Sequence, residues 1–243
     1  MSIYLKIREQ GPAKKFAVLI DPDKYSGESI IAIAKESERN LVDILLVGGS
    51  LLINDHLEET ILRIKDHCSI PVVLFPGSSL QVNRHADAIL FLSLISGRNP
   101  EMLIGQHVIA APYIRDAGLE VIPTGYMLIE SGETTTASYM SNSLPIPYHK
   151  KDIAVCTAMA GEMLGLKMIY LDGGSGAMKA VSVEMVESVR QNISIPMVVG
   201  GGIRDPQTAA DICKAGADLV VVGNAIEDNM DKLSLISDAI HSL

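Results

Sequence analysis

The chain has 243 residues, a length typical of a single domain in which eight strands alternate with helices. Its formal net charge of −9 argues against a broad surface for nucleic acid, and no apolar run reaches the roughly 18 residues of a membrane span. The three cysteines form no Cys-x-x-Cys or Cys/His pattern, so the sequence predicts neither a disulfide framework nor a zinc site. No signal-peptide pattern opens the chain, and together these features predict a cytoplasmic protein.

Short apolar runs alternate with amphipathic stretches along the chain, which is typical of strands alternating with helices. We expect strands near Phe16–Asp21, Asp43–Gly48, Val72–Pro76, Ala88–Leu94, Glu120–Glu130, Met168–Asp172, Met197–Gly201 and Leu219–Gly223. Two helices between them have start and stop signals, at Asn99, Pro100 and Gly118 and at Asp205, Pro206 and Gly216. Eight repeats of strand and helix favour a single-domain (β/α)8 TIM barrel over residues 1–243, and an open doubly wound sheet is the alternative.

One connection is much longer than the others. It runs from Ser131 to Lys151, is rich in Ser, Thr and Pro, and exceeds the length of an ordinary connector in a compact domain. We expect a mobile flap over the active-site face of the barrel. A loop that only packs against the barrel, or that joins subunits, is the alternative.

Oxygen ligands follow the first two predicted strands, where a TIM barrel places its active site. Asp21 ends the first strand and Asp23 follows it, and Ser50 closes Val47-Gly-Gly-Ser50 after the second strand. A magnesium ion commonly takes one or two carboxylates together with waters and substrate phosphates, so Asp21 with Ser50 could hold one. Asp23 is explained at least as well by capping of the following helix.

Glycine-marked segments close the last three predicted strands. Gly200-Gly-Gly follows the seventh strand and Gly223-Asn224 the eighth, and the loops at these two positions usually hold phosphate in this fold. Glycine permits close approach of backbone N–H groups to a phosphate and a positive φ where the turn needs it. After the sixth strand, Asp172 could accept a proton from a substrate hydroxyl while Ser175 holds the phosphate. These segments predict a phosphorylated ligand but do not specify the reaction.

Two further groups of residues are less informative. The six histidines form no ligand-spaced pair, and we assign them no chemistry. On the fifth strand, Tyr126, Met127, Leu128 and Ile129 could line an apolar tunnel, or they could belong to the core, where methionine is more common.

Six segments in this order resemble the geranylgeranylglyceryl phosphate synthase family, which includes heptaprenylglyceryl phosphate synthases. They are Leu19-Ile-Asp-Pro-Asp-Lys24, Val47-Gly-Gly-Ser50, Pro123-Thr-Gly-Tyr126, Tyr170-Leu-Asp-Gly-Gly-Ser-Gly-Ala177, Gly200-Gly-Gly-Ile203 and Gly223-Asn224. The resemblance runs through essentially the whole chain. It implies a magnesium-dependent prenyltransferase that joins sn-glycerol 1-phosphate to geranylgeranyl or a similar polyprenyl diphosphate, forms an ether and releases diphosphate. It also implies a cytoplasmic homo-oligomer that serves ether phospholipid biosynthesis.

The same resemblance implies roles for individual residues. It places magnesium on Asp21 and Ser50, and catalysis on Asp172 and Tyr170. It places the glycerol phosphate along Tyr170, Leu171, Asp172, Gly173, Gly174, Ser175 and Gly176, with the phosphate against Gly201, Gly202, Gly223 and Asn224. The chain departs from the family at two positions. It has Asp172 where the family usually has glutamate, and Gly173 where the family commonly has alanine. Aspartate is one methylene shorter, and the extra glycine could let the backbone move inward to restore the reach.

Two other functions stay open on the residues. One is a sugar-phosphate isomerase or lyase, which would need a Schiff-base lysine or paired carboxylates. Lys24 and Lys167 are poorly placed for the first role, and Asp21 with Glu130 is the only such carboxylate pair. The other is a non-catalytic protein that binds phosphate or prenyl lipid. This alternative stays open because the chain has an aspartate at position 172 in place of the family's usual glutamate.

Overall fold

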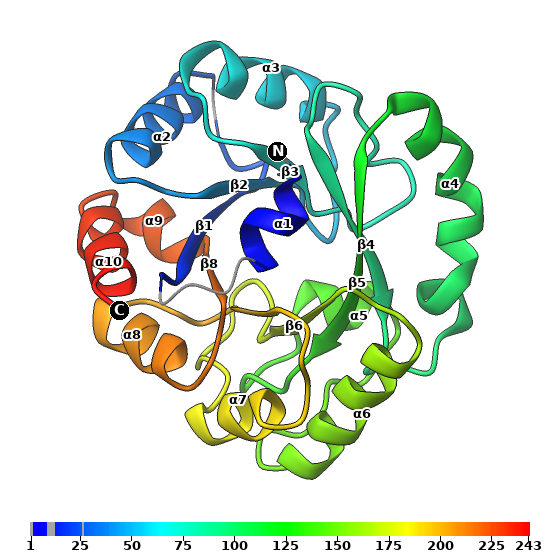
Figure 1. Cartoon of the computed structure of the whole chain (residues 1–243). Coiled ribbons are helices and arrows are strands. Elements are labelled where there is room, and N and C mark those ends of the chain that lie inside the picture. Colours follow the sequence, from blue (N-terminus) through cyan, green and yellow to red (C-terminus); the bar gives the residue numbers. More distant parts are fainter. Residues whose placement is uncertain (1, 9–12, 26) are drawn as a thin grey trace.

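Eight parallel strands form a closed barrel in which the strands follow one another in chain order (Figure 1). The computed structural model describes residues 2–8, 13–25 and 27–243. Within them, the strands are β1 (Lys15–Ile20), β2 (Ile44–Val47), β3 (Val72–Leu74), β4 (Ala88–Leu94), β5 (Glu120–Leu128), β6 (Met168–Asp172), β7 (Met197–Gly200) and β8 (Leu219–Val222). All eight expected strands are present. Several end earlier than predicted, because the residues after them leave the ladder to form the mouth of the barrel.

The barrel closes through pairing of the first strand with the last. Lys15 lies opposite Leu219 and Val18 opposite Val222, in parallel register like every other pair. The TIM barrel predicted from the sequence is therefore confirmed, and the open doubly wound sheet is wrong.

The strand side chains alternate between two apolar layers. Leu46, Tyr126 and Tyr170 belong to the inner layer. Met127 and Leu171 belong to the outer layer, which also contains residues of the surrounding helices. Both faces of each strand are thus buried, which is why the strands read as continuous apolar runs.

The helices surround the strands as an outer ring (Figure 1). Seven of them are α2 (Gly27–Arg39), α3 (Leu57–His67), α4 (Gln106–Ala117), α6 (Lys151–Met163), α7 (Val183–Arg190), α8 (Pro206–Lys214) and α10 (Lys232–His241). Shorter helical segments are α1 (Ile3–Arg8), η1 (Glu101–Gly105), α5 (Thr136–Met140) and α9 (Asn224–Asp228), of which η1 is a π-helix. Residues 75–87, between β3 and β4, contain no helix, so the expected alternation fails at this one connection.

The two helices with sequence signals begin and end as expected. Asn99 accepts the N–H of Glu101 at 3.1 Å as the chain enters η1 and α4, and Gly118 ends α4 with φ of 71°. Before α8, Asp205 accepts the N–H of Thr208 at 2.9 Å. These polar side chains satisfy N–H groups that have no partner within the helix.

α1 closes the N-terminal end of the barrel and lies across the middle of the ring of strands in Figure 1. The backbone N–H groups of Ile3 and Tyr4 donate to the Glu120 carboxylate at 2.7 and 2.9 Å. Ile3 and Ile7 pack into the inner layer. In the described part of the chain, the cavities of the barrel accordingly lie at its C-terminal end. No helix in the described ranges is both long and apolar enough to cross a membrane.

Candidate active site

Two cavities meet at the C-terminal ends of the strands. The polar pocket, of about 180 Å³, is bounded by Asp21, Tyr170, Asp172 and the glycine loops after β6, β7 and β8. The apolar groove, of about 850 Å³, runs from the barrel mouth over β3 and β4 toward α3 and α4. The residues that line both cavities are Gly49, Ser50, Leu51, Phe75 and Tyr126. The two cavities are therefore parts of one site.

The glycine loops after β6 and β7 are in close contact. Gly201 and Gly202 have φ of 79° and 73°, and Gly174 has φ of 86°. A Cβ on Gly201 would lie 2.6 Å from the N atom of Gly174 and 2.7 Å from Oδ1 of Asp172. Glycine is required here both for the left-handed backbone and for this close approach.

The loop after β8 joins the same pocket. Gly223 and Asn224 line it, and the Ser175 hydroxyl donates to Oδ1 of Asn224 at 3.5 Å. Arg204, which we did not single out from the sequence, also lines the pocket and donates from Nη2 to the carbonyl oxygen of Ala177 at 2.9 Å. Its position after the Gly-Gly-Gly run was the only available signal. The pocket therefore combines backbone amides with a cation, which suits a phosphate.

Asp172 is buried at the junction of the pocket and the groove. Its Oδ2 accepts the hydroxyl of Tyr126 at 2.5 Å, and its Oδ1 accepts the N–H of Gly174 at 2.7 Å. Burial raises the pKa of this carboxyl above its ordinary value, although both hydrogen bonds oppose the rise. The carboxyl faces the pocket with a fixed orientation and an increased affinity for a proton.

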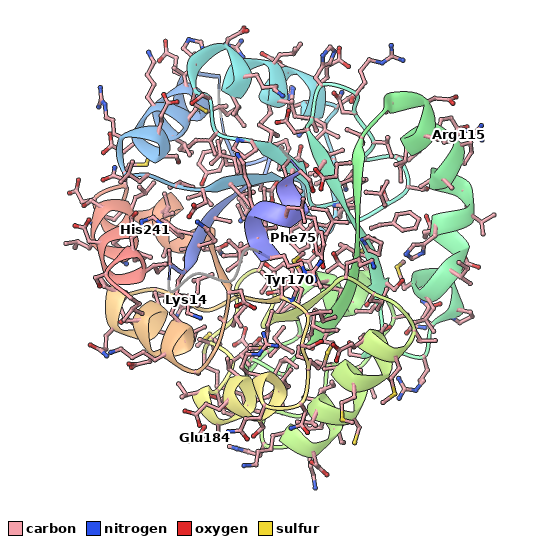
Figure 2. The ribbon with its side chains drawn as sticks, in the orientation of Figure 1. Lys14, Phe75, Arg115, Tyr170, Glu184 and His241 are labelled. Carbon is pink, nitrogen blue, oxygen red and sulfur yellow. The ribbon has the colours of Figure 1, made fainter. Side chains whose placement is uncertain are left out.

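Three aromatic rings pack against one another where the polar pocket meets the groove. Phe75 stacks on Tyr170 with ring centroids 5.4 Å apart, and both rings meet Tyr126 edge to face. Phe75 and Tyr170 lie near the barrel axis in Figure 2. The sequence indicated Phe75 only as the start of a run of small residues, and we missed its position. The hydrogen bond from Tyr126 was also missed, although Tyr126 ends one of the six segments of the resemblance.

Asp21 and Ser50 both line the polar pocket, as the proposed pair of magnesium ligands requires. Oδ1 of Asp21 accepts the N–H of Asp23 at 3.1 Å. A Cβ on Gly49 would lie 3.4 Å from Oδ2 of Asp21, which shows how closely the loops after β1 and β2 approach each other. Burial raises the pKa of Asp21, so a nearby cation would stabilise its charged form.

The donors present fit a magnesium ion. They are one carboxylate and one hydroxyl, and the described residues contain no group of three or more His, Cys, Asp or Glu that could hold a metal. Such a site would leave most coordination positions to water and phosphate oxygens, as magnesium prefers. Asp23 instead accepts the N–H groups of Ile53 at 2.5 Å and Asn54 at 3.2 Å, and so holds the loop after β2.

Two of the predicted substrate-binding residues do not line the pocket. The side chain of Leu171 is fully buried in the outer layer, because strand alternation points it away from the barrel axis. Gly173 donates its N–H to the carbonyl oxygen of Gly200 at 3.0 Å, which extends the pairing of β6 with β7. Predicted residues that do line the pocket are Asp21, Ser50, Tyr170, Asp172, Gly174, Ser175, Gly176, Gly201, Gly202, Gly223 and Asn224.

The groove lies where the helix between β3 and β4 is missing. Ile89 and Phe91 of β4, Leu57 of α3 and Ala110 and Ile114 of α4 line it. Without a covering helix, apolar side chains that would otherwise be in the core instead form the wall of a cavity.

Residues from the middle of the chain complete this wall. Tyr126 and Leu128 of β5 line the groove, whereas Met127 and the next residue after the strand, Ile129, are in the outer core. The expectation of an apolar tunnel therefore holds for two of the four residues. His107 also lines the groove. Its Nε2 lies 3.2 Å from Oγ of Ser93, and burial lowers the pKa of the imidazole, which favours its neutral form.

The long segment after β5 covers the active-site face, as predicted. Thr136 lines the polar pocket, and Met140 and Ser141 line the groove. The segment contains α5, and Asn99 anchors it by donating from Nδ2 to the carbonyl oxygen of Ser141 at 2.7 Å. Its predicted mobility stays a prediction.

The fold and the site define a TIM-barrel protein with glycine loops of the phosphate-binding type and an adjoining apolar groove of about 850 Å³. The chain belongs to the PcrB family, whose model matches residues 7–240. It is 55% identical over 229 residues to the geranylgeranylglyceryl phosphate synthase of Chitinophaga pinensis, covering 94% of this chain and 91% of that protein.

Two solved structures have the same fold over the whole chain. The wild-type enzyme of this name from Thermoplasma volcanium is 36% identical, with a TM-score of 0.94 and coverage of 100% and 99% of the two chains. The (S)-3-O-geranylgeranylglyceryl phosphate synthase of Thermoplasma acidophilum, solved in complex with its substrate sn-glycerol-1-phosphate, is 33% identical with a TM-score of 0.93 and full coverage of both chains.

Proposed function

We propose that this protein is a prenyltransferase that joins sn-glycerol 1-phosphate to geranylgeranyl or a similar polyprenyl diphosphate, forming an ether and releasing diphosphate. The observation that carries the proposal is the junction at Phe75 and Tyr126, where the polar pocket opens into the apolar groove. A small phosphorylated acceptor fits the pocket, and a long apolar donor fits the groove. The relatives named above support the same reaction.

The glycine loops would bind and orient the acceptor. Backbone N–H groups after β6, β7 and β8, with Arg204 beside them, suit a phosphate. Holding the phosphate at this end directs the glycerol hydroxyls toward Asp172 and Tyr170. Such positioning converts an encounter of two substrates into a reaction within one complex, and it selects which hydroxyl and which enantiomer reacts.

Asp172 would accept the proton of the attacking hydroxyl. The hydroxyl oxygen forms a bond to the allylic carbon, the bond between that carbon and the diphosphate oxygen breaks, and the proton passes to the carboxylate. The raised pKa of Asp172 makes it a better base than an exposed aspartate, and Tyr126 holds its orientation. The aspartate is within the pocket despite being shorter than the glutamate usual in the family.

Magnesium would be held by Asp21 and Ser50 together with diphosphate oxygens and water. When bound, it would stabilise the negative charge that develops on the leaving diphosphate. The fit of the two oxygen donors and the burial of Asp21 support this assignment. A cytoplasmic location, a homo-oligomeric state and a role in ether phospholipid biosynthesis belong to the same proposal.

The sugar-phosphate isomerase or lyase is less well supported. Glu130, the possible partner of Asp21, is exposed, binds the N–H of Tyr148 at 3.0 Å and lines neither cavity. Lys167 precedes β6 and therefore lies at the end of the barrel opposite the site. Lys24 does line the polar pocket, so the expectation that it is poorly placed is wrong, and its position is the one observation in the described part of the chain that favours this alternative. A non-catalytic binding protein would use the same cavities, and turnover separates it from an enzyme.

The test is product formation by the purified protein with magnesium, geranylgeranyl diphosphate and either sn-glycerol 1-phosphate or sn-glycerol 3-phosphate. We expect an ether product from the 1-phosphate only. Product from neither acceptor, with phosphate binding intact, would contradict the proposal and favour a binding protein or another barrel enzyme.

A further inference from the structure

Four exposed apolar side chains surround the mouth of the apolar groove. They are Leu51, Ile53, Leu80 and Met140, which line the groove and yet are 48, 82, 89 and 47% exposed. They come from the loops after β2 and β3 and from α5. The apolar lining of the groove therefore continues onto the outer surface of the protein.

Two more exposed apolar side chains come from the chain segment that carries Met140. Tyr139 and Leu144 are 78 and 87% exposed and belong to the segment that lines the groove through Met140 and Ser141. We call Leu51, Ile53, Leu80, Tyr139, Met140 and Leu144 the apolar rim. Exposed large apolar side chains gathered at one opening indicate an interaction surface, whereas single ones do not.

The backbone that carries the rim is held in place by polar contacts. The Asp23 carboxylate accepts the N–H groups of Ile53 and Asn54. In the segment after β5, Thr135 and Ser138 form a capping box at the start of α5, and Ile146 forms a β-bridge with Ile129. The rim side chains are thus presented on anchored segments rather than packed inward.

We propose that the apolar rim docks on the surface of a lipid bilayer, so that the polyprenyl chain passes between bilayer and groove. The proposal rests on the proposed function, in which the donor and the product both carry a long apolar chain that dissolves in a bilayer. A second copy of the protein seated on the rim would close the groove mouth through which that chain must pass. A bilayer covers the same side chains and keeps the mouth connected to a medium that dissolves the chain.

The charge of the protein indicates which bilayer surface fits. A net charge of −9 gives no general attraction to anionic headgroups, so docking relies on insertion of the rim side chains into the headgroup region. Binding to zwitterionic phosphatidylcholine should therefore suffice, and it should change little with salt concentration.

The first test is flotation of the whole protein with phosphatidylcholine vesicles in the absence of substrate. The test variant is Tyr139→Ser with Leu144→Ser, because neither side chain lines the groove. The matched control is Met163→Ser with Leu164→Ser, which are both 80% exposed but lie at the C-terminal end of α6, at the opposite end of the barrel. We expect the wild type and the control to float with the vesicles and the bound fraction of the test variant to fall by about fivefold.

The second test compares two donors. With geranylgeranyl diphosphate in the vesicles, the test variant should show a higher KM and an unchanged kcat. With water-soluble geranyl diphosphate it should match the wild type, because the groove and the pocket are intact. This second donor also detects a folding defect, which would lower turnover in both assays.

Some outcomes would overturn the docking proposal. The wild-type protein could stay in solution, or the test variant could float as well as the wild type. The wild type could also self-associate through a contact that the test variant loses. In each case turnover on the soluble donor would be kept. Failure of the proposed function looks different, because both donors would then give no product while vesicle binding persisted.

Discussion

Tyr126 donates a hydrogen bond of 2.5 Å from its hydroxyl to Oδ2 of Asp172, at the boundary between the polar pocket and the apolar groove. The two residues come from neighbouring strands, and Asp172 lies opposite Leu128, two residues beyond Tyr126. The Tyr126 side chain therefore points toward the barrel mouth and bonds to a residue two positions further along the strand direction. It joins the wall of the groove to the carboxylate that we propose as the proton acceptor.

Replacing Asp172 by Asn should lower kcat by about 10²- to 10⁴-fold, the usual contribution of a general base. Binding of sn-glycerol 1-phosphate, measured by calorimetry, should change little because the glycine loops are retained. Normal turnover would remove the proton-acceptor role.

The same substitution should not lower thermal stability at neutral pH. The folded-state pKa of Asp172 is raised above 3.8, so the folded state holds its proton to higher pH than the unfolded chain does. Wild-type stability therefore falls as the pH rises from 3.8 through the folded pKa, and asparagine removes this loss. In thermal unfolding, the variant should have a higher Tm than the wild type. This difference should increase with pH across the same window.

Tyr126→Phe should move the acid limb of the kcat profile to higher pH. The Tyr126 hydroxyl favours the charged form of Asp172, so its removal raises the pKa of the carboxyl further, and the base is protonated up to a higher pH. Turnover at neutral pH should fall by about tenfold. Thr124→Val is the control, because it removes a hydroxyl from the same strand. That hydroxyl donates to the carbonyl oxygen of Ile122, so its loss should leave the pH profile unshifted.

Gly201→Ala should abolish phosphate binding and destabilise the fold. An added Cβ would meet the Gly174 N atom and the Asp172 carboxylate at 2.7 Å or less, and φ is 79°. Gly118→Ala is the control, because its φ is 71° but no heavy atom lies within 4 Å of the added Cβ. The control should lose only about 1 kcal/mol in chemical unfolding and keep phosphate binding. Equal losses in both variants would mean that the close contact at Gly201 is unimportant.

Asp21→Asn should abolish activity together with its dependence on magnesium, while retaining affinity for sn-glycerol 1-phosphate. The control Asp23→Asn keeps the pocket carboxylate and weakens the contacts to the loop after β2. Rates measured across a magnesium titration should therefore separate the two variants. An Asp21→Asn enzyme that is fully active and still stimulated by magnesium would contradict the metal assignment.

Asp43→Asn should destabilise the barrel near neutral pH by about 1–2 kcal/mol. Burial opposes ionisation of Asp43, but His241, the Phe16 N–H and Lys15 outweigh it and lower the pKa of the carboxyl. The resulting stability is present above the unfolded value of 3.8 and is lost as the pH falls through the folded pKa. Urea unfolding should show this loss in the wild type and not in the variant. Asp116→Asn, in a surface pair with Arg115 at the edge of Figure 2, should change stability by less than about 0.5 kcal/mol.

The amino-acid sequence by itself favoured the barrel over an open sheet and determined which residues meet in the polar pocket. Apolar runs such as Met168–Asp172 predict strands buried on both faces, and glycines such as Gly201 and Gly202 mark the loops that approach a phosphate. Parallel strands in a closed barrel bring the residues that follow them to one end, so Asp21, Ser50 and Asp172 could be assigned to one pocket without coordinates.

Only the tertiary structure decided how the pocket meets the groove. The position of Phe75 on Tyr170, the bond from Tyr126 to Asp172 and the outward side chain of Leu171 depend on strand register and side-chain packing. The groove itself arises because residues 75–87 form no helix, which leaves part of β4 uncovered. A local sequence pattern indicates the spacing of apolar residues in a helix or strand and the residues at which strands end. A cavity depends instead on which helices and strands leave each other uncovered, and that is a property of the whole packed chain.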